Sequence, residues 1–173
     1  MITLVVLLTV LALGSAPAVI DSYTMDLQLD AGAGRLVGTM DLEYLNNSDD
    51  AIGELMLRLD LNLTRPESMI INEVTDSNGA PLDWAYQPVE RGPLSDARGR
   101  MSVSLPHVLQ PGERTKLHIK FRLRGGEFLN TYMLLLQDDP YMSLDAWYPK
   151  AMHYGPFDTW DDNDFRPATY DIT

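Results

Sequence analysis

The sequence predicts an all-β fold, either an antiparallel β-sandwich or a curved saddle-like sheet, preceded by an apolar signal segment. Two observations lead to this prediction. Apolar and polar residues alternate along several runs of the chain, and glycine, proline and asparagine separate these runs. With 45% hydrophobic and 22% charged residues among 173, the composition is that of a globular domain that can bury a core.

The first residues are expected to direct export and not to join the fold. Residues 2–19 are almost wholly apolar, and Ala16-Pro17-Ala18 fits the small-x-small pattern of a signal peptidase site, so residues 1–18 are expected to be a signal peptide. The alternative is a retained membrane anchor, because the run approaches the roughly 20 apolar residues that a span needs. Both interpretations place the remainder outside the cytoplasm, as a secreted, periplasmic or membrane-anchored protein. Contact with a membrane is expected only if the first 19 residues are kept as an anchor.

The β-domain is expected to cover residues 19–126. Alternation predicts strands because successive side chains of a strand point to opposite faces, one toward the core and one toward water. The alternating runs cover residues 23–30, 36–44, 55–64, 101–105 and 116–123. In the third run, five leucines alternate without a break from Leu55 to Leu63, which predicts a single strand. Asn78-Gly79 predicts a hairpin turn, since both residues tolerate a positive φ.

Residues 127–173 are expected to be an aromatic and acidic connector that ends with the start of a further strand. The alternation fades after Gly125-Gly126, and residues 138–173 hold eight aspartates against one lysine and one arginine. The cooperative folding unit is therefore expected to end near Gly126, with the connector partly mobile. Residues 168–173 resume the alternation where the sequence stops. This strand is expected to be an unpaired or weakly paired edge, and the chain to be the amino-terminal piece of a longer protein.

Charge and composition exclude several classes of function. The 13 Lys and Arg against 25 Asp and Glu give a net charge of −12, which disfavours nucleic acid as a partner. Without cysteine, the chain has no disulfide, thiolate nucleophile or cysteine zinc site. Three histidines are present, but the sequence has no zinc-binding His-Glu-x-x-His motif and no phosphate-binding glycine loop. We therefore expect no catalytic residue, no metal ligand and no cofactor in this chain.

Two patterns offer weak alternatives to that expectation. An acidic run supplies oxygen ligands of the kind that calcium prefers, although its spacing is not that of an EF-hand loop. The run consists of Asp158, Asp161, Asp162, Asn163 and Asp164. His153 lies among aromatic residues and is either a ligand or proton carrier, or a packed side chain.

Other polar positions also have a functional and a structural interpretation. His118 lies in the polar register of its strand among basic residues. It is expected either to pair across strands with an acidic row such as Asp41 and Glu43, or to form a stripe that docks an anionic partner. Asn46 and Asn62 match the glycosylation acceptor pattern, and Asn62 is expected to be exposed on the polar face of the leucine run.

The aromatic residues of the connector are the candidates for an interaction site. Trp147, Tyr148, Pro149 and Trp160 are expected to dock on a following domain, because aromatic side chains dominate buried interfaces. The alternative is a stacking platform for a carbohydrate or a peptide.

Several short motifs occur together in one order, and their order resembles that of a known family. They are residues 23–30 and 36–44 with Asn46-Asn47-Ser48 after them, then 55–59 and 61–63, then 109–113 leading into 117–121, then Trp147-Tyr148-Pro149 and residues 167–171. This arrangement resembles the amino-terminal saddle-shaped β-domain of the aminopeptidase N-like zinc metallopeptidases, the gluzincin aminopeptidase family. The resemblance covers roughly residues 20–173, on the strand-and-turn pattern described above.

The resemblance implies that a catalytic domain follows this chain. In that domain two histidines and a glutamate bind zinc, and a second glutamate acts as the base on the zinc-bound water. The chain would then be the non-catalytic amino-terminal domain of an exported peptidase and would shape access to the active site. Its partners would be that catalytic domain, in the same polypeptide, and the peptide substrate. The family's Gln-x-Glu pattern for the substrate amine is not recognisable here, and Asp138, Asp139 and Asp145 do not inherit that role. The alternative function is a secreted β-sandwich that binds a carbohydrate or a peptide.

Overall fold

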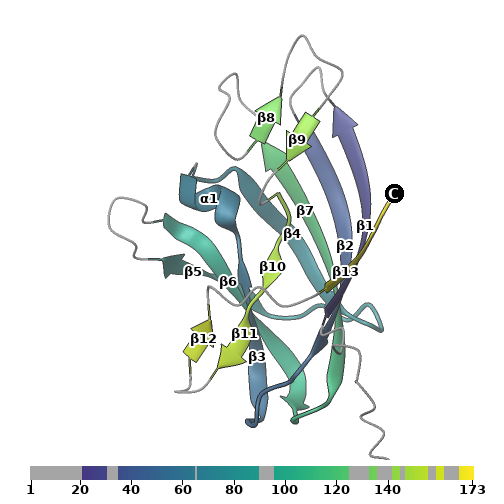
Figure 1. Cartoon of the computed structure of the whole chain (residues 1–173), viewed down its shortest axis with the longest axis vertical. Helices are drawn as coiled ribbons and strands as arrows, with labels where there is room; N and C mark the ends of the chain where they lie inside the picture. Colours follow the sequence, from purple (N-terminus) through teal and green to yellow (C-terminus); the bar gives the residue numbers. More distant parts are fainter. Residues whose placement is uncertain are drawn as a thin grey trace, which may run out of the picture.

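The structure is a computed structural model, and it describes most of the chain after residue 20 (Figure 1). The described residues are 21–30, 35–64, 66–89, 96–124, 133–135, 142–144, 147–155, 159–161 and 168–173. The expected signal segment, residues 1–18, lies outside them. The elements in chain order are β1 (Asp21–Asp30), β2 (Arg35–Leu45), β3 (Ile52–Arg58), α1 (Asp60–Thr64), β4 (Met69–Asp76), β5 (Trp84–Val89), β6 (Asp96–Leu109), β7 (Arg114–Arg124), β8 (Met133–Leu135), β9 (Met142–Leu144), β10 (Lys150–Ala151), β11 (His153–Gly155), β12 (Thr159–Asp161) and β13 (Ala168–Ile172).

Two β-sheets face each other around one hydrophobic core, which confirms the predicted sandwich. The five-stranded sheet has the order β13-β1-β2-β7-β4 and lies at the right in Figure 1. The four-stranded sheet has the order β10-β3-β6-β5 and lies to its left. Their strands pair antiparallel, except for β1 with β13, which run parallel. The short pairs β8–β9 and β11–β12 form separate two-stranded sheets.

Period-two patterning places the apolar residues in the core, as the sequence predicts. Along β2 and β7, alternate side chains are buried between the sheets and the others face water. The buried side chains of these two strands are Leu36, Met40, Leu42, Tyr44, Leu117, Ile119, Phe121 and Leu123. The four-stranded sheet contributes Leu55, Leu57, Met101 and Val103 from its side. Burial of this apolar surface is the main favourable contribution to folding.

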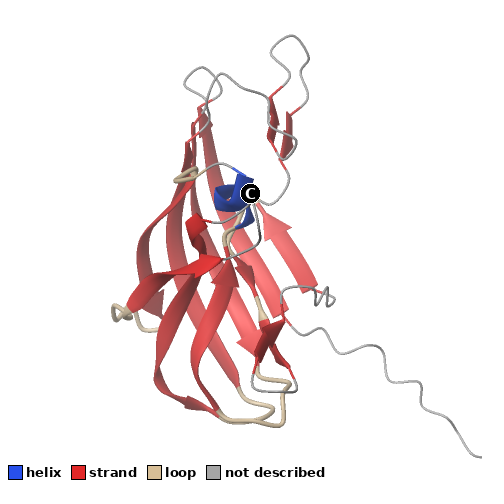
Figure 2. Cartoon of the chain, turned by 90° about the vertical axis from the view of Figure 1, so that its left-hand side faces the viewer, coloured by secondary structure: helices blue, strands red, loops and turns tan. Residues whose placement is uncertain are grey.

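The leucine run is the clearest disagreement with the expected strands. Strand β3 ends at Arg58, and the second half of the run forms the short helix α1, blue in Figure 2. The alternating pattern does not distinguish a strand from this helix, because Leu59 and Leu61 are buried in the helix, as they would be in a strand. The buried Asn62 connects α1 with β4 and β6. Its amide donates to the carbonyls of Met69 and Arg98 at 3.0 and 2.9 Å, and its oxygen accepts from the amide of Met69 at 2.7 Å.

Among the residues that the structure describes, no helix has the length and apolar character to cross a membrane.

The predicted turn at Asn78-Gly79 forms, but it does not join two neighbouring strands of one sheet. Gly79 has φ of 80°, and Asp76 Oδ1 accepts hydrogen bonds from the amides of Ala80 and Asn78 at 2.9 and 2.8 Å. These bonds, with that of Ala80 the stronger, lower the pKa of Asp76 below its ordinary value. After a single bridge between Thr75 and Pro81, the chain leaves β4 and enters β5 of the other sheet.

The last strand was expected to be an unpaired or weakly paired edge, and the structure shows that it is paired. Residues 168–172 of β13 align with residues 21–25 of β1 in five consecutive parallel positions. The backbone of Thr173 extends this pairing, since its amide donates to Met25 O at 3.0 Å and its carbonyl accepts from Leu27 N at 3.1 Å. Strand β1 lies more than a hundred residues before β13 in the chain, so a prediction that considered only the residues after β13 could not identify β1 as its partner. The strand is nevertheless the edge of its sheet.

Gly38 leaves space in the core for the side chains of the neighbouring strands β1 and β7, and this gives a testable prediction. A Cβ atom at Gly38 would lie 2.8 Å from both Leu27 Cδ2 and Phe121 Cζ, whereas one at Gly53 would meet nothing within 4 Å. We expect Gly38→Val to lower the free energy of unfolding by about 1–3 kcal/mol, because overpacking forces core side chains to move. Gly53→Val, the matched control in β3, should be neutral or slightly stabilising. Urea unfolding curves measure both, and equal effects would contradict this account of the core.

Candidate functional site

Three tyrosines from distant parts of the chain form the most distinctive cluster on the molecule. We call Tyr23, Tyr148 and Tyr170 the tyrosine cluster. Tyr23 stacks on Tyr170 with ring centroids 5.2 Å apart and planes 9° from parallel. Tyr148 meets both rings edge-on, at 5.4 Å from Tyr23 and 5.9 Å from Tyr170. Its hydroxyl lies 3.0 Å from that of Tyr170. Each such aromatic pair stabilises the fold by roughly 0.5–1.5 kcal/mol, in addition to the effect of burying the surface of the rings.

Tyr23 connects this cluster to the connector's backbone. Its side chain is buried, and its hydroxyl accepts a hydrogen bond from Ala151 N at 3.2 Å. Burial, assisted by the neighbouring Asp21 carboxylate, raises the pKa of Tyr23 far above its ordinary value of 10.0. The phenol therefore stays neutral and supplies a hydrogen bond and an aromatic surface, not a charge or a base.

The four docking candidates fall into two groups. Trp147 packs edge-on against Tyr148 at 5.3 Å and so extends the tyrosine cluster, next to the buried Pro149. Trp160 instead packs on Tyr154 at 5.3 Å, in the two-stranded sheet β11–β12. Both tryptophans and Tyr148 are partly buried against the hydrophobic core. These described residues of the connector thus pack on the β-domain, and β10 pairs directly with β3.

His153 is a packed residue with a buried carboxylate partner. Its Nε2 lies 3.1 Å from Asp21 Oδ2, and both side chains are about 95% buried or more. The ring stacks on Tyr44 at 5.4 Å, while Asp21 Oδ1 accepts a 3.5 Å contact from Leu45 N. Nδ1 has no hydrogen-bond partner among the described residues. Sequence reasoning found His153 but missed Asp21, since the two are far apart in the chain and Asp21 stands at the start of a strand.

Asp21 and His153 are the residue types of an acid–base dyad, but they lack the access to substrate that such a dyad needs. A general base must lie within hydrogen-bond reach of a substrate proton. Here the exposed area of both side chains is too small to admit one. The pair therefore holds β1 to the connector, and we assign it a structural role.

The solvent face of the five-stranded sheet carries the expected ion pairs. His118 Nδ1 lies 2.6 Å from Asp41 Oδ1, and Lys116 Nζ lies 2.5 Å from Asp41 Oδ2. Arg114 and Glu43 pair in the same way at 3.1 Å. This arrangement bears out the cross-strand interpretation of His118, because its basic neighbours face carboxylates of β2.

Neither glycosylation acceptor asparagine has an exposed side chain, and the expectation for Asn62 was wrong. Asn46 and Asn62 are fully buried. The Asn46 amide donates to the carbonyls of Asp50 and Leu109 at 2.8 and 3.0 Å, which closes the loop between β2 and β3. Both asparagines therefore act as buried hydrogen-bonding centres of turns.

The described residues do not bring together a set of metal ligands. No group of three or more His, Asp or Glu side chains lies close enough among them to hold a metal ion. Of the calcium candidates, Asp161 belongs to β12, whereas Asp158, Asp162, Asn163 and Asp164 lie outside the described residues. His107, His118 and His153 lie on separate strands and have different environments: exposed, ion-paired and buried. This donor set does not fit a zinc site.

Comparison with known proteins gives structural but no sequence relatives. No family model matches the chain, and no curated protein matches it. Among solved structures, the M1 zinc metallopeptidase from Deinococcus radiodurans aligns with a TM-score of 0.54 and 16% identity, covering 89% of this chain and 31% of that one. A mutant of the Deinococcus radiodurans enzyme bound to a Tyr-Ser-Ala substrate gives 0.51 and 17%. A two-domain M1 zinc metallopeptidase mutant bound to L-arginine gives 0.51 and 18%.

These alignments define the fold. The chain has the fold of one part of the aminopeptidase N-like zinc metallopeptidases, as its motif order indicates. It spans about a third of their length, 31% in each of these alignments. At identities below a fifth, the likeness concerns the fold alone, because one fold can host many functions.

The ion pairs of Asp41 predict a pH dependence. Partial burial alone would raise the pKa of this carboxyl, but hydrogen bonds and charge attraction from His118 and Lys116 outweigh it and lower the pKa below 3.8. A carboxyl whose pKa is lower in the folded state adds stability above its unfolded pKa and loses it as the pH falls. We expect the stability difference between wild type and Asp41→Asn to be constant at neutral pH and to shrink below pH 3.8. Denaturant unfolding across this range measures it, and a pH-independent difference would contradict the assignment.

The Asp21–His153 contact predicts coupling between β1 and the connector. In a double-mutant cycle, Asp21→Ala and His153→Ala should show a coupling free energy of about 0.5–3 kcal/mol. The matched control combines His153→Ala with Glu67→Ala, whose partner is Arg98, and should be additive. Amide exchange at Ala151 and Met152, which donate to Tyr23 and Met56, should accelerate in both contact variants. Additivity of the contact pair would show that the connector does not fold with β1.

Proposed function

We propose that this chain is the non-catalytic amino-terminal domain of an exported aminopeptidase-like zinc metallopeptidase. The observation that carries the proposal is the alignment of 89% of the chain with under a third of an M1 zinc metallopeptidase. An alignment that covers most of this chain but under a third of the peptidase supports the proposal that the chain is one domain of such an enzyme. In this proposal the zinc, the catalytic glutamate and the residues that bind the peptide's reacting bond belong to the rest of the polypeptide.

The role that remains for this domain is to shape access to the catalytic domain. Two features of the described residues support this role. They do not form a group of ligands that fits zinc, and the pair Asp21 and His153 is buried and inaccessible to a substrate. The four-stranded and five-stranded sheets provide a rigid wall, and such walls limit which substrates reach a site. The apolar first residues support the export that this proposal includes.

The rim formed by Trp147 and Tyr148 is the proposed contact with the catalytic domain. Both side chains are partly buried on the core side and partly open to solvent, so a second domain can complete their burial. Pro149, the residue after Tyr148, is buried within this chain. Trp160 belongs to the separate β11–β12 pair. The alternative, a secreted module that binds carbohydrate or peptide, is weaker because these aromatic rings pack on one another and on the core.

Activity assays on two lengths of the polypeptide test the proposal. The 173-residue chain alone should hydrolyse no aminoacyl arylamide, with or without zinc. The polypeptide extended by its following coding sequence should hydrolyse it with zinc and lose activity when zinc is chelated. That following sequence should contain a His-Glu-x-x-His motif and a downstream glutamate. A stop codon directly after Thr173 would overturn the proposal.

A second comparison isolates the access role. The following sequence without this domain should retain activity on a short arylamide but change its kcat/KM for longer peptides, because only longer substrates reach the wall. Equal changes for short and long substrates would show that the domain merely stabilises the catalytic domain.

A further inference from the structure

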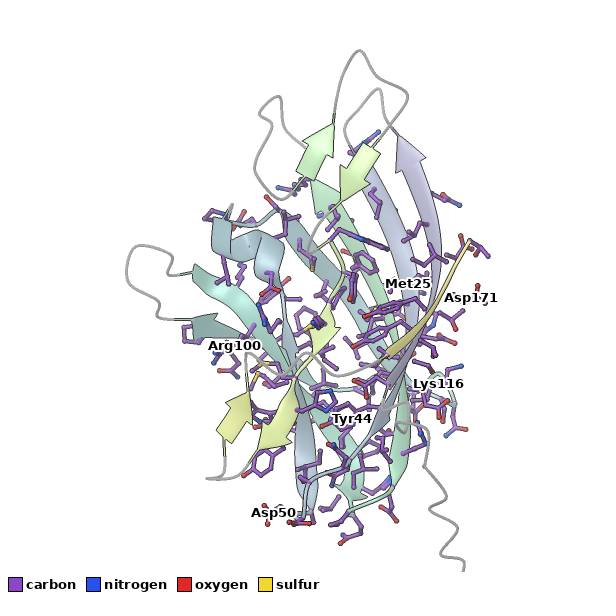
Figure 3. All side chains as sticks on the ribbon, in the orientation of Figure 1. Met25, Tyr44, Asp50, Arg100, Lys116 and Asp171 are labelled. Atoms are coloured by element: carbon purple, nitrogen blue, oxygen red, sulfur yellow. The ribbon has the colours of Figure 1, made fainter. Side chains whose placement is uncertain are left out.

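The chain crosses from the five-stranded to the four-stranded sheet through an exposed turn between β4 and β5 (Figure 1). The turn follows Asp76, which aligns with Leu117 of β7, one residue from the Lys116 labelled in Figure 3. All residues from Ser77 to Ala80 are exposed. A Cβ atom added at Gly79 would meet nothing within 4 Å, so the described residues leave the tip of the turn open to water.

The tip of this turn is formed by Asn78 and Gly79, the one Asn-Gly pair in the sequence. Because glycine carries no Cβ, its backbone nitrogen approaches the side chain of the preceding residue with little steric hindrance. Asparagine offers an amide carbon, Cγ, that this nitrogen can attack with closure of a cyclic imide. The pair is therefore of the type that deamidates spontaneously in water.

Deamidation at this pair needs water and no other reactant. The Gly79 nitrogen loses its proton to solvent and bonds to Cγ of Asn78, the Cγ–Nδ2 bond breaks, and Nδ2 leaves as ammonia after it takes up a proton. Water then opens the imide at one of its two carbonyl carbons. Attack at Cγ breaks the new N–Cγ bond and gives aspartate. Attack at the main-chain carbonyl carbon breaks the original peptide bond and gives isoaspartate. No atom is oxidised or reduced.

Hydrogen bonds within the turn oppose the first step of this reaction. The Gly79 amide, which must lose its proton, donates that proton to Asp76 O at 3.0 Å. The carboxylate of Asp76 holds the turn in this form, because Oδ1 accepts from the amides of Asn78 and Ala80 at 2.8 and 2.9 Å. The Gly79 nitrogen can attack only after it leaves its acceptor. The turn therefore slows a reaction that its sequence favours.

The other described asparagines lack either the exposure or the following glycine. Asn46 and Asn62 are fully buried. Asn47 and Asn72 precede residues that carry a side chain, which hinders the approach of the backbone nitrogen. Among the described residues, Asn78 alone combines both features.

We propose that Asn78 is a deamidation site of the folded chain and that Asp76 limits its rate by holding the turn closed. Asp76 is a positioning residue, since it acts through the backbone of its neighbours and takes no part in the ring closure. The inference goes beyond the proposed function and does not depend on it.

Isoaspartate at this position would weaken the connection between the two sheets. It adds one carbon atom to the backbone within the turn and leaves a free carboxylate near that of Asp76. The backbone bonds from Asp76 N to Ala80 O at 2.9 Å and from Leu82 N to Val74 O at 3.0 Å both span the altered position. The modified chain should therefore unfold at a lower urea concentration than the unmodified chain.

Peptide mapping by mass spectrometry after incubation at mildly alkaline pH tests the site. Trypsin cleavage after Arg58 and Arg91 leaves Asn62, Asn72 and Asn78 in one peptide, so the first two serve as internal controls. In the folded 173-residue chain Asn78 should be converted, partly to isoaspartate, while both controls stay intact. In concentrated urea the rate at Asn78 should rise about tenfold or more, because the Gly79 amide no longer has to leave its acceptor.

Variants of Asp76 test the positioning role. Asp76→Ala should raise the rate at Asn78 in the folded chain by about tenfold, since it removes the acceptor of two turn amides. Asp76→Asn, the matched control, keeps an acceptor oxygen and should retain most of the protection. Asn78→Gln, aged equally, should keep the urea midpoint that aged wild type loses. Circular dichroism establishes that the variants stay folded.

Three results would overturn the proposal. One is an intact Asn78 in the folded chain under conditions that convert it in urea, and another is an equal rate in the two states. The third is a folded Asp76→Ala chain that deamidates no faster than wild type.

Discussion

The burial of Tyr23 at the start of β1 brings together three described residues from the last part of the chain, Tyr148, Ala151 and Tyr170. Its ring supports Tyr170 of β13 on one side and Tyr148 of the connector at its edge, and its hydroxyl holds the amide of Ala151. One side chain thus connects the edge of the five-stranded sheet with β10 of the four-stranded sheet. The neighbouring Asp21 adds a second tie through His153. Both sheets therefore depend on a few residues that directly follow the expected signal segment.

Sequence patterning predicts the strands of this fold wherever one face is buried and the other meets water. The runs that became β1, β2 and β7 satisfy that condition, and so their alternation was informative. Leu59 to Leu63 does not satisfy it, because Asn62 in the polar register is buried and bonded to Met69 and Arg98. A buried polar residue removes the contrast on which alternation depends. Similarly, the contacts of His153 with Asp21 and of Tyr170 with Tyr23 join residues more than a hundred positions apart, where no local pattern can indicate them.

The ion pairs of β2 and β7 specify alignment more than they add stability. Exposed pairs contribute about 0–1 kcal/mol each. The row of Arg114, Lys116 and His118 nevertheless faces Glu43 and Asp41 only in the observed register. A slip of one residue would move these charges into the core and the apolar residues into water. Charge and hydrophobicity therefore select the same alignment, and the five-stranded sheet acquires a single register around Gly38, where Phe121 fills the space that a side chain would occupy.

The same strand periodicity explains why the described residues do not bring a set of zinc ligands together. Catalysis by zinc requires several ligands that converge on one point. In a sandwich, neighbouring positions of a strand face opposite sides, so side chains converge only where strands place them in one register. His107, His118 and His153 fall on an exposed strand segment, an ion-paired outer face and a buried contact. Asp21 and His153 do converge, but both side chains are buried, and the His153 ring stacks on Tyr44. The aromatic rim formed by Trp147 and Tyr148 reaches the surface instead, and it is suited to contact with other protein surfaces.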